Sequence, residues 1–362
     1  MKQVLIKKGR VFTEEVPAPV VSDGAVLIKV VASCISAGTE LAAVASSGEP
    51  LIKKALQQPE KIVKAFNMLK VDGFLKVMEK IKGKFSPAAA TGYSVSGVVI
   101  GTGRGVTKFK IGQPVAAAGA GRANHAEFVD VPENLVVKIP DGLDFKEASS
   151  VALGSIALHG VRRANLKMGE FGVVFGSGVI GLIAVQLLKL SGVRVIAVDL
   201  DDRRLKIAQQ LGAEIVINPQ NEDPVKVVEN FSGGVGVDVV LFTAATDSSE
   251  PISRAFQMCR KKGRVVLVGV AGMNLKREDL YAKEIDLIMA TSYGPGRYDN
   301  DYEQKGQDYP YAYVRWTENR NMAEYLRLLA TGQIKLEKLI NGVFPVERAE
   351  EAFGALDRKS VV

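Results

Sequence analysis

The sequence is poor in the residues that build disulfide frameworks and metal centres: its 362 residues include two cysteines, two histidines and one tryptophan. Cys34 and Cys259 lie far apart along the chain, which excludes a disulfide framework and a cysteine-rich zinc site, so both are expected to be structural thiols. His125 and His159 are too few for a histidine-built metal site, and each is expected to make an ordinary polar contact.

The sequence also lacks the patterns of a secretory leader and of a membrane-spanning helix. Its first residues, MKQVLIKKGRVFTEE, contain no long apolar run and no small-residue cleavage site, so we expect a cytoplasmic protein. The longest uncharged stretch, Phe171 to Leu188, is interrupted by three glycines, which favours a buried strand, loop and helix over a membrane helix.

Nucleic acid is not an expected partner, although the net charge is +7 and the pI is near 9.2. Lysine and arginine are scattered along the chain and interleaved with acidic residues, so no basic patch stands out. With 47% hydrophobic and 24% charged residues, the composition is that of a globular protein, and the length favours two domains.

The amino-terminal part has a β pattern as far as about Pro140. Short apolar or alternating runs such as QVLIKK, AVLIKVVASC and VSGVVIGTG are separated by Gly, Pro, Asn and Asp, which predicts a barrel-like domain. Residues 49–84 interrupt this pattern with apolar positions at three- and four-residue spacing, which predicts two amphipathic helices. They either pack on the barrel with a solvated lysine face or form a lid or partner surface.

From about Ala148 to Gly294 the pattern changes to strands that alternate with helices, as in VRVIAVD, VDVVLFTA and GRVVLVGV. This alternation predicts a doubly wound parallel sheet. We therefore expect an α/β protein in which a β-rich, barrel-like part is followed by a doubly wound part.

A G-x-G-x-x-G motif is the strongest chemical signal, and it stands between a predicted strand and a predicted helix. The first glycine permits a tight turn, the second lets the backbone approach a pyrophosphate, and the third lets helix and strand pack closely. We assign to this phosphate-binding turn Gly176, Ser177, Gly178, Val179, Ile180 and Gly181.

Asp199 ends the next predicted strand, near the expected offset of about 20 residues from the glycine motif. A carboxylate there accepts hydrogen bonds from the adenosine ribose and repels a 2′-phosphate, so NAD is favoured over NADP. Arg203 and Arg204 follow closely and either neutralise a phosphate or are ordinary surface residues of a first helical turn.

At these residues the chain resembles the medium-chain dehydrogenase/reductase family, which includes the zinc alcohol dehydrogenases and sorbitol dehydrogenases, over essentially its whole length. The block ALGSIALHGVRRANLKMGEFGVVFGSGVIGLIAVQLLKLSG and the segment GRVVLVGVAG carry the likeness. The resemblance implies a GroES-like β-barrel catalytic domain, residues 1–150 and 295–362, and a Rossmann NAD-binding domain, residues 151–294. It also implies a homodimer or homotetramer, with Asp199 and Arg204 at the adenine ribose and a nicotinamide pocket lined by Thr243, Val268 and Ser292. Tyr293 then either lies beside the nicotinamide or simply packs at the end of a strand.

The zinc ligands of that family are missing from this sequence. Its pattern for the first cysteine aligns with SCISAGTEL so that Ala37 occupies the ligand position, and Cys34 is three residues out of register. Its Gly-His-Glu pattern aligns with TGYSVSGVV, which contributes Tyr93 and Ser94, and the segment GTGRGVTKFKIGQPVAAAG has none of the cysteines of a structural zinc loop. We expect no zinc of either kind.

Without zinc, a carbonyl–alcohol reaction needs another group to manage one proton. Tyr93 takes the vacated ligand position, where its phenol is a hydrogen-bond donor to a carbonyl oxygen or simply fills the metal cavity. By resemblance, Thr39 stands where the family uses a hydroxyl to relay protons toward the nicotinamide ribose, and Glu40 orients Thr39 or acts as a base.

The chain is also similar to the dehydrogenase module of bacterial bi-domain oxidoreductases, through SAGTE (36–40), TGYSVSGVV (91–99) and the aromatic, acidic segment 293–322. That resemblance implies cell-surface polysaccharide metabolism and a second oxidoreductase domain, which is not in this sequence. A stand-alone relative and a truncated chain both account for this. SAGTE also resembles a zinc-free dehydrogenase of bacteriochlorophyll biosynthesis. Residues 293–316 either bind sugars by stacking and hydrogen bonding or form a loop or interdomain contact.

Three functions remain open on the sequence. The first is an NAD-dependent dehydrogenase or reductase of a small-molecule polyol, sugar or sugar-derived carbonyl compound. The second is a zinc-free enoyl or quinone reductase, which often uses NADPH and against which Asp199 counts. The third is a non-catalytic, NAD-binding partner of another oxidoreductase subunit. The sequence leaves the substrate and the direction of reaction open.

Overall fold

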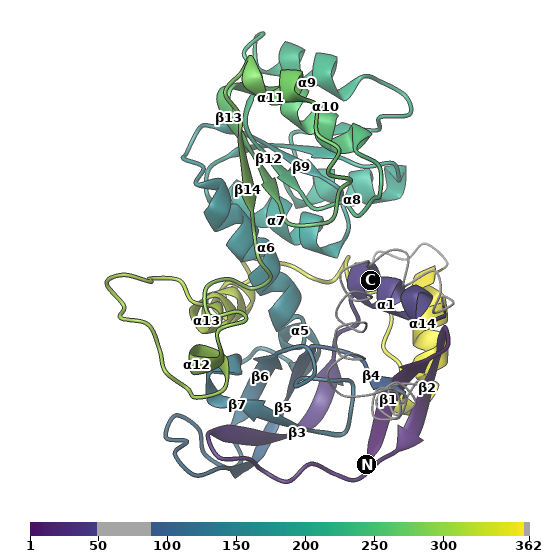
Figure 1. Cartoon of the computed structure of the whole chain (residues 1–362), viewed down its shortest axis with the longest axis vertical. Helices are drawn as coiled ribbons and strands as arrows, with labels where there is room; N and C mark the ends of the chain where they lie inside the picture. The colour runs from purple at the N-terminus through teal and green to yellow at the C-terminus, as the bar shows by residue number, and fades with distance from the viewer. Residues whose placement is uncertain (49–87, 358–362) are drawn as a thin grey trace, which may run out of the picture.

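The computed structural model describes residues 1–48 and 88–357, so the two helices expected over residues 49–84 lie outside the described residues. The described strands form three sheets, two in the lower part of the molecule and one in the upper part (Figure 1). The sheets confirm the expected α/β class, with an antiparallel barrel-like unit and a doubly wound parallel sheet.

The lower part is built from antiparallel strands rich in β-branched residues. Five of them follow the order β7-β3-β5-β6-β8, and their alternating valines and isoleucines, such as Val26 and Ile28, fill a core inside the curled sheet. The bounds are β3 (Ala25–Ser33), β5 (Ser94–Thr102), β6 (Pro114–Ala118), β7 (Phe128–Pro132) and β8 (Val136–Lys138). A smaller sheet, ordered β2-β1-β4, contains β1 (Lys2–Lys7), β2 (Arg10–Glu15) and β4 (Ala89–Ala90).

The upper part is a six-stranded parallel sheet in the order β11-β10-β9-β12-β13-β14. Its strands are β9 (Phe171–Phe175), β10 (Arg194–Val198), β11 (Ile215–Ile217), β12 (Val237–Phe242), β13 (Cys259–Leu267) and β14 (Asp286–Met289). The covering helices are α7 (Val179–Leu190), α8 (Asp202–Leu211), α9 (Pro224–Phe231), α10 (Glu250–Met258) and α11 (Arg277–Tyr281). Chain order reverses between β9 and β12, which is the place where sheets of this kind bind ligands at their carboxyl edge.

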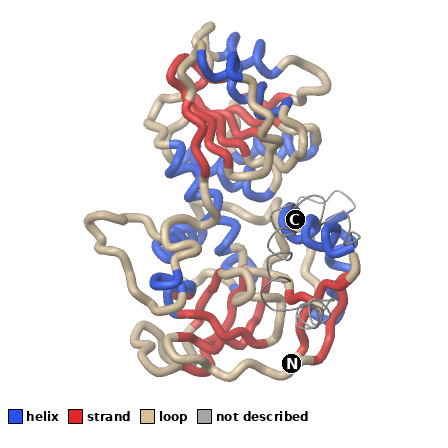
Figure 2. Tube along the Cα trace, viewed as in Figure 1, coloured by secondary structure: helices blue, strands red, loops and turns tan. Residues whose placement is uncertain are grey.

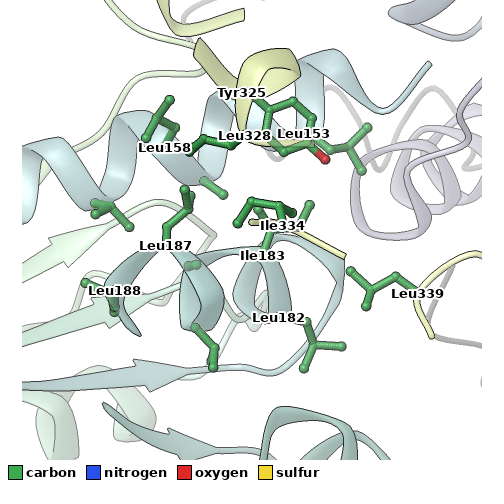
Figure 3. Packing of buried hydrophobic residues seen from close by; sticks show 14 of the residues in the cluster. Leu153, Leu158, Leu182, Ile183, Leu187, Leu188, Tyr325, Leu328, Ile334 and Leu339 are labelled. Atoms are coloured by element: carbon green, nitrogen blue, oxygen red, sulfur yellow. The ribbon is translucent and has the colours of Figure 1, made fainter. Parts of the chain in front are cut away.

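One hydrophobic cluster joins α6 (Val151–Ala164), α7 and α13 (Glu318–Ala330), as Figure 3 shows for Leu153, Leu187 and Leu328. Gly154 makes the close approach of α6 and α13 possible, because a Cβ there would lie 2.1 Å from the Tyr325 ring. The Tyr325 hydroxyl then pairs with Ser150 Oγ at 2.9 Å, so the buried phenol keeps a polar partner.

The remaining elements are short apart from α1 (Ala37–Gly48), which follows β3, and α14 (Ala349–Asp357), which packs against β2. They are η1 (Glu133–Leu135), α5 (Phe145–Ala148), α12 (Asn300–Glu303) and η2 (Val346–Arg348). A long loop connects α12 with α13 (Figure 2). None of the described helices has the length and apolarity needed to cross a membrane.

Candidate functional site

The glycine motif forms a tightly packed turn between β9 and α7. Gly176 has a φ of +103°, and a Cβ there would lie 2.6 Å from the backbone N of Ala244. A Cβ on Gly181 would lie 1.9 Å from the carbonyl oxygen of Gly176. The first and third glycines are therefore required by the fold of the turn itself.

Gly178 has a different environment, because it is the N-cap of α7 and a Cβ there would meet nothing within 4 Å. No side chain caps this helix end, and the side chains of Val179 and Ile180 pack into the core, so they offer only backbone N–H groups to a ligand. The first turn of α7 thus presents backbone donors and the positive end of the helix dipole, which suits an anionic group such as a phosphate.

Asp199, which follows β10, is bonded directly to this turn. Its Oδ2 accepts a hydrogen bond from Ser177 N at 2.6 Å, and its Oδ1 accepts one from Asp201 N at 2.9 Å. Each carboxylate oxygen has acceptor capacity left for the hydroxyls of a ribose. Ser177 is fully buried and its Oγ has no hydrogen-bond partner among the described residues.

The two arginines that follow differ in their partners. The Arg203 guanidinium pairs with Asp201 at 2.9 Å, and this hydrogen bond holds the pKa of Asp201 below its usual value. Arg204 lies in the first turn of α8, and its buried Nε has no hydrogen-bond partner in the described part of the chain. Arg204 is therefore the cation at this edge of the sheet that keeps donor capacity.

Three further candidates follow neighbouring strands at the same carboxyl edge. Thr243 follows β12, and its hydroxyl donates to the carbonyl of Gly176 at 2.6 Å, so it ties β12 to the glycine turn. Val268 follows β13 and packs on α6, where a Cβ on Gly160 would lie 2.7 Å from Val268 Cγ2. Ser292 follows β14 in a turn with a φ of +50°.

Tyr93 and Thr39 are brought together although 54 positions separate them in the sequence. Tyr93, immediately before β5, is 8% exposed, and the Ser36 and Thr39 side chains lie near enough to its phenol to lower its pKa against the larger effect of burial. Burial is the main reason that the pKa of Tyr93 rises to about 12. The phenol is consequently protonated throughout the neutral range and suits hydrogen-bond donation.

Glu40 is buried in a separate network behind these hydroxyls. Its Oε1 accepts from Ser36 N at 2.9 Å, and its Oε2 accepts from Thr91 Oγ1 at 3.0 Å and contacts His125 Nε2 at 2.8 Å. Gly92, with a φ of +95°, lets the chain pass the imidazole, since a Cβ there would lie 2.6 Å from His125 N. Glu40 thus joins α1 to two distant segments of the sheets.

Sequence reasoning did not identify Thr91 and His125 as partners of Glu40. Nothing in their local spacing signals the contact, because 85 positions separate His125 from Glu40. His125 makes the expected polar contact through one nitrogen, while its buried Nδ1 has no partner among the described residues.

The residues at the expected metal position do not suit zinc. Ser94 Oγ donates to the carbonyl of Ser149 at 2.6 Å and accepts from Ala152 N at 3.0 Å, so it is used at the start of α6. Burial raises the pKa of the Cys34 and Cys259 thiols to about 12, which disfavours the thiolate that zinc requires. Within residues 1–48 and 88–357, no three His, Cys, Asp or Glu side chains gather as a metal site. The absence of zinc stays a prediction.

The aromatic segment that follows β14 contains both buried and exposed tyrosines, and Tyr298 is 72% exposed. Tyr293 and Tyr302 are 2% and 1% exposed, whereas Tyr311 and Tyr313 in the loop before α13 are 56% and 88% exposed. Sugar stacking by this segment stays a prediction, for which the exposed tyrosines are the available rings.

Comparisons with known proteins find dehydrogenases. A family model described as zinc-binding dehydrogenase matches residues 179–305. A D-guloside 3-dehydrogenase from Escherichia coli (strain K12) is 30% identical over 278 residues, which cover 75% of this chain and 73% of that enzyme. An alcohol dehydrogenase from Geobacillus stearothermophilus is 36% identical over 147 residues, so that alignment spans 40% of this chain and 42% of the relative's length.

The fold also matches solved structures. The alcohol dehydrogenase TADH from Thermus sp. ATN1 superposes with a TM-score of 0.74, covering 99% of this chain and 97% of that one at 21% sequence identity. At this identity the likeness concerns the fold.

Proposed function

This chain belongs to the medium-chain dehydrogenase/reductase family, and from that premise we propose that it is an NAD-dependent oxidoreductase acting on a polyol, sugar or sugar-derived carbonyl compound. The observation that carries the proposal is the glycine turn at the start of α7, to which the Asp199 carboxylate is hydrogen bonded. A phosphate site and a ribose acceptor in one rigid unit are what a dinucleotide requires.

The described residues fit NAD. The backbone N–H groups of the glycine turn would hold the pyrophosphate, Asp199 the adenosine ribose, and the ends of β12, β13 and β14 the nicotinamide, with Thr243, Val268 and Ser292 as lining residues. The unpartnered hydroxyl of buried Ser177 supports this assignment. Bound NAD supplies the hydride acceptor and NADH the hydride donor.

Asp199 favours NAD over NADP because its negative charge repels a 2′-phosphate. Arg204 acts in the opposite direction, since its Nε has no partner among the described residues. Both oxygens of Asp199 are fixed by backbone N–H groups, so the carboxylate cannot turn away from the ribose position without breaking these bonds. We therefore keep NAD as the cofactor.

The proton is assigned to this chain's own hydroxyls rather than to zinc. Tyr93 donates a hydrogen bond to the substrate oxygen as its protonated phenol, and Thr39 continues the hydrogen-bonded chain from Tyr93. Glu40 orients these groups through the backbone of Ser36. No step uses zinc, because Ala37, Tyr93 and Ser94 are not a set of zinc ligands.

The substrate class is supported by the relative named D-guloside 3-dehydrogenase, whose name gives a sugar derivative as its substrate. Three other parts of the proposal rest on family resemblance: a role in cell-surface polysaccharide metabolism, a homodimer or homotetramer, and cooperation with a second oxidoreductase domain. We also propose a cytoplasmic location. We also propose residues 1–150 and 295–362 as the catalytic domain and residues 151–294 as the NAD-binding domain.

Calorimetric titration of the full chain with NADH and NADPH, with zinc analysis of the same sample, tests the proposal. Strong NADH binding, weak NADPH binding and no zinc are expected, followed by turnover on a panel of sugars and polyols. Stoichiometric zinc contradicts the zinc-free assignment, and a preference for NADPH contradicts the assignment of Asp199. Reduction of enoyl or quinone compounds alone identifies the second function class, and NADH binding without turnover identifies a partner subunit.

A further inference from the structure

A buried carboxyl without a partner lies behind the turn that carries Ser292. Glu318, the first residue of α13, is 0% exposed, and neither of its carboxyl oxygens has a hydrogen-bond partner among the described residues. The chain passes close to it, since a Cβ on Gly296 would lie 3.1 Å from Glu318 Oε1. The proposed hydride and proton transfers do not use this group.

Several ionisable groups surround Glu318. Arg297, the cation that acts on Glu318, pairs through Nη1 with Glu303 of α12 at 2.6 Å, while its buried Nε has no hydrogen-bond partner among the described residues. Glu303 also accepts from Tyr298 N at 3.1 Å. The other ionisable groups in this electrostatic cluster are the phenols of Tyr293, Tyr302 and Tyr309. Glu318 therefore faces a second carboxylate and an arginine that is hydrogen bonded to that carboxylate through one of its nitrogens.

A buried carboxylate that accepts no hydrogen bond is unfavourable, so the neutral acid is the form suited to this place. Burial, and then the charge of Glu303, raise the pKa of Glu318 to about 9, against the smaller opposing effect of Arg297. The N-terminal dipole of α13 also favours the ionised form, but this effect is smaller than that of burial. Glu318 is consequently protonated at neutral pH.

The first turn of α13 donates hydrogen bonds to two backbone carbonyls in the turn that follows Ser292. Glu318 N donates to the carbonyl of Pro295 at 2.8 Å, and Asn321 Nδ2 donates to the carbonyl of Tyr293 at 2.7 Å. A Cβ on Gly294, whose φ is +117°, would lie 2.5 Å from Asn321 Nδ2. There is little room for the turn to move while α13 keeps its position.

We propose that Glu318 is a positioning residue. While its buried carboxyl is neutral, residues 292–297 stay packed on α13, and its ionisation in alkaline solution displaces them. Ser292 lies in this segment, so the expected consequence is weaker binding of NADH. This consequence rests on the proposed function, whereas the movement of the turn does not.

The chain contains its own reporter for this movement. Trp316 is the one tryptophan in the sequence and precedes Glu318 by two positions. Its indole lies under the guanidinium of Arg162, 3.4 Å from the ring centroid, and Arg162 also donates to Asn321 Oδ1. A change at the start of α13 will therefore alter the surroundings of the indole.

The experiment follows tryptophan emission and NADH affinity of the full chain from neutral to alkaline pH. The wild-type emission should change with one proton at a midpoint near the pKa of about 9. If NADH binds only the protonated form, its affinity should fall about tenfold at one pH unit above that pKa. Glu318→Gln should abolish both changes, because it keeps a neutral side chain of the same size. Exposed Glu337 provides the control Glu337→Gln, which should behave like the wild type.

A second variant keeps the test decisive if Glu318→Gln does not fold. Glu303→Gln leaves Glu318 buried but removes the negative charge that adds to the effect of burial on its pKa, so the emission midpoint should move to lower pH. A wild-type emission that does not change, or the same midpoint in Glu318→Gln, overturns the inference. An emission change with no binding of NADH at any pH overturns its cofactor part and the proposed function together, while an emission change with pH-independent NADH binding overturns the cofactor part alone.

Discussion

Replacing Gly178 and Gly181 separately by alanine should distinguish phosphate binding from folding. The two glycines belong to one turn, but their surroundings differ. A Cβ on Gly178 meets nothing within 4 Å, whereas a Cβ on Gly181 would lie 1.9 Å from the carbonyl oxygen of Gly176 and 2.9 Å from Thr243 Oγ1. Gly178 also has a φ of −72°, which any residue adopts.

Gly181→Ala should destabilise the protein. The new contact must widen from 1.9 Å to at least 3.0 Å, and the atom it meets belongs to the backbone, so α7 must move away from β9. Overpacking of this kind costs about 1–3 kcal/mol. For a unit of roughly 150–250 residues, that free energy lowers Tm by roughly 2–12 °C. The shift of α7 also displaces the backbone donors, so NADH affinity should fall as well.

Gly178→Ala should leave Tm within about 2 °C, because surface substitutions change the free energy of unfolding by about 0.5 kcal/mol or less. Its methyl group nevertheless occupies the place where a pyrophosphate approaches the backbone, so NADH affinity should fall by about tenfold or more. Differential scanning calorimetry gives Tm, and titration calorimetry gives the affinity. Wild-type NADH affinity in Gly178→Ala would refute the assigned phosphate position, and an unchanged Tm in Gly181→Ala would refute the steric argument.

Two other changes test the remaining parts of the site, and a third tests the effect of burial on stability. Asp199→Asn keeps the shape of the side chain but removes its charge, so NADPH affinity relative to NADH should rise about tenfold in titration calorimetry, and an unchanged ratio contradicts the repulsion argument. Tyr93→Phe should lower kcat by about 10²- to 10⁴-fold with unchanged NADH affinity, whereas a wild-type kcat would mean that the ring only fills space. Burial lowers the pKa of His159 to about 4 from 6.5, so the unfolded chain binds the proton first as pH falls. The contribution of His159 to the free energy of unfolding should be fully present above pH 6.5 and fall by roughly 3 kcal/mol by pH 4. Urea unfolding of His159→Gln should not show this dependence on pH.

The cofactor side of the molecule was predictable because its signals are local. The spacing of the glycines predicted a strand, a turn and a helix in this order, which are β9, the glycine turn and α7. The same pattern predicted Asp199 at the end of the next strand, β10. A Cβ on Gly176 would be too close to Ala244, and a Cβ on Gly181 would be too close to the turn itself. The motif already requires glycine at both positions.

The proton-handling side was less predictable because its contacts join distant segments. Tyr93 and Thr39 were chosen by resemblance, and only the fold shows that their hydroxyls meet. The partners of Glu40 come from positions 36, 91 and 125, and no periodicity links these positions. Glu318 gave no signal, since a glutamate at the start of a helix is usually a solvated N-terminal residue.

The hydrogen bond between Asp199 and Ser177 N has a consequence for engineering. The residue that we propose to select between the two cofactors also holds the backbone that we propose as their pyrophosphate site. On this proposal, a mutation that relaxes selectivity by removing this carboxylate also breaks the hydrogen bond that holds the turn, so it is expected to weaken the binding of both dinucleotides. A designer can avoid that loss by supplying a neutral acceptor for Ser177 N before adding a positive charge beside Arg204.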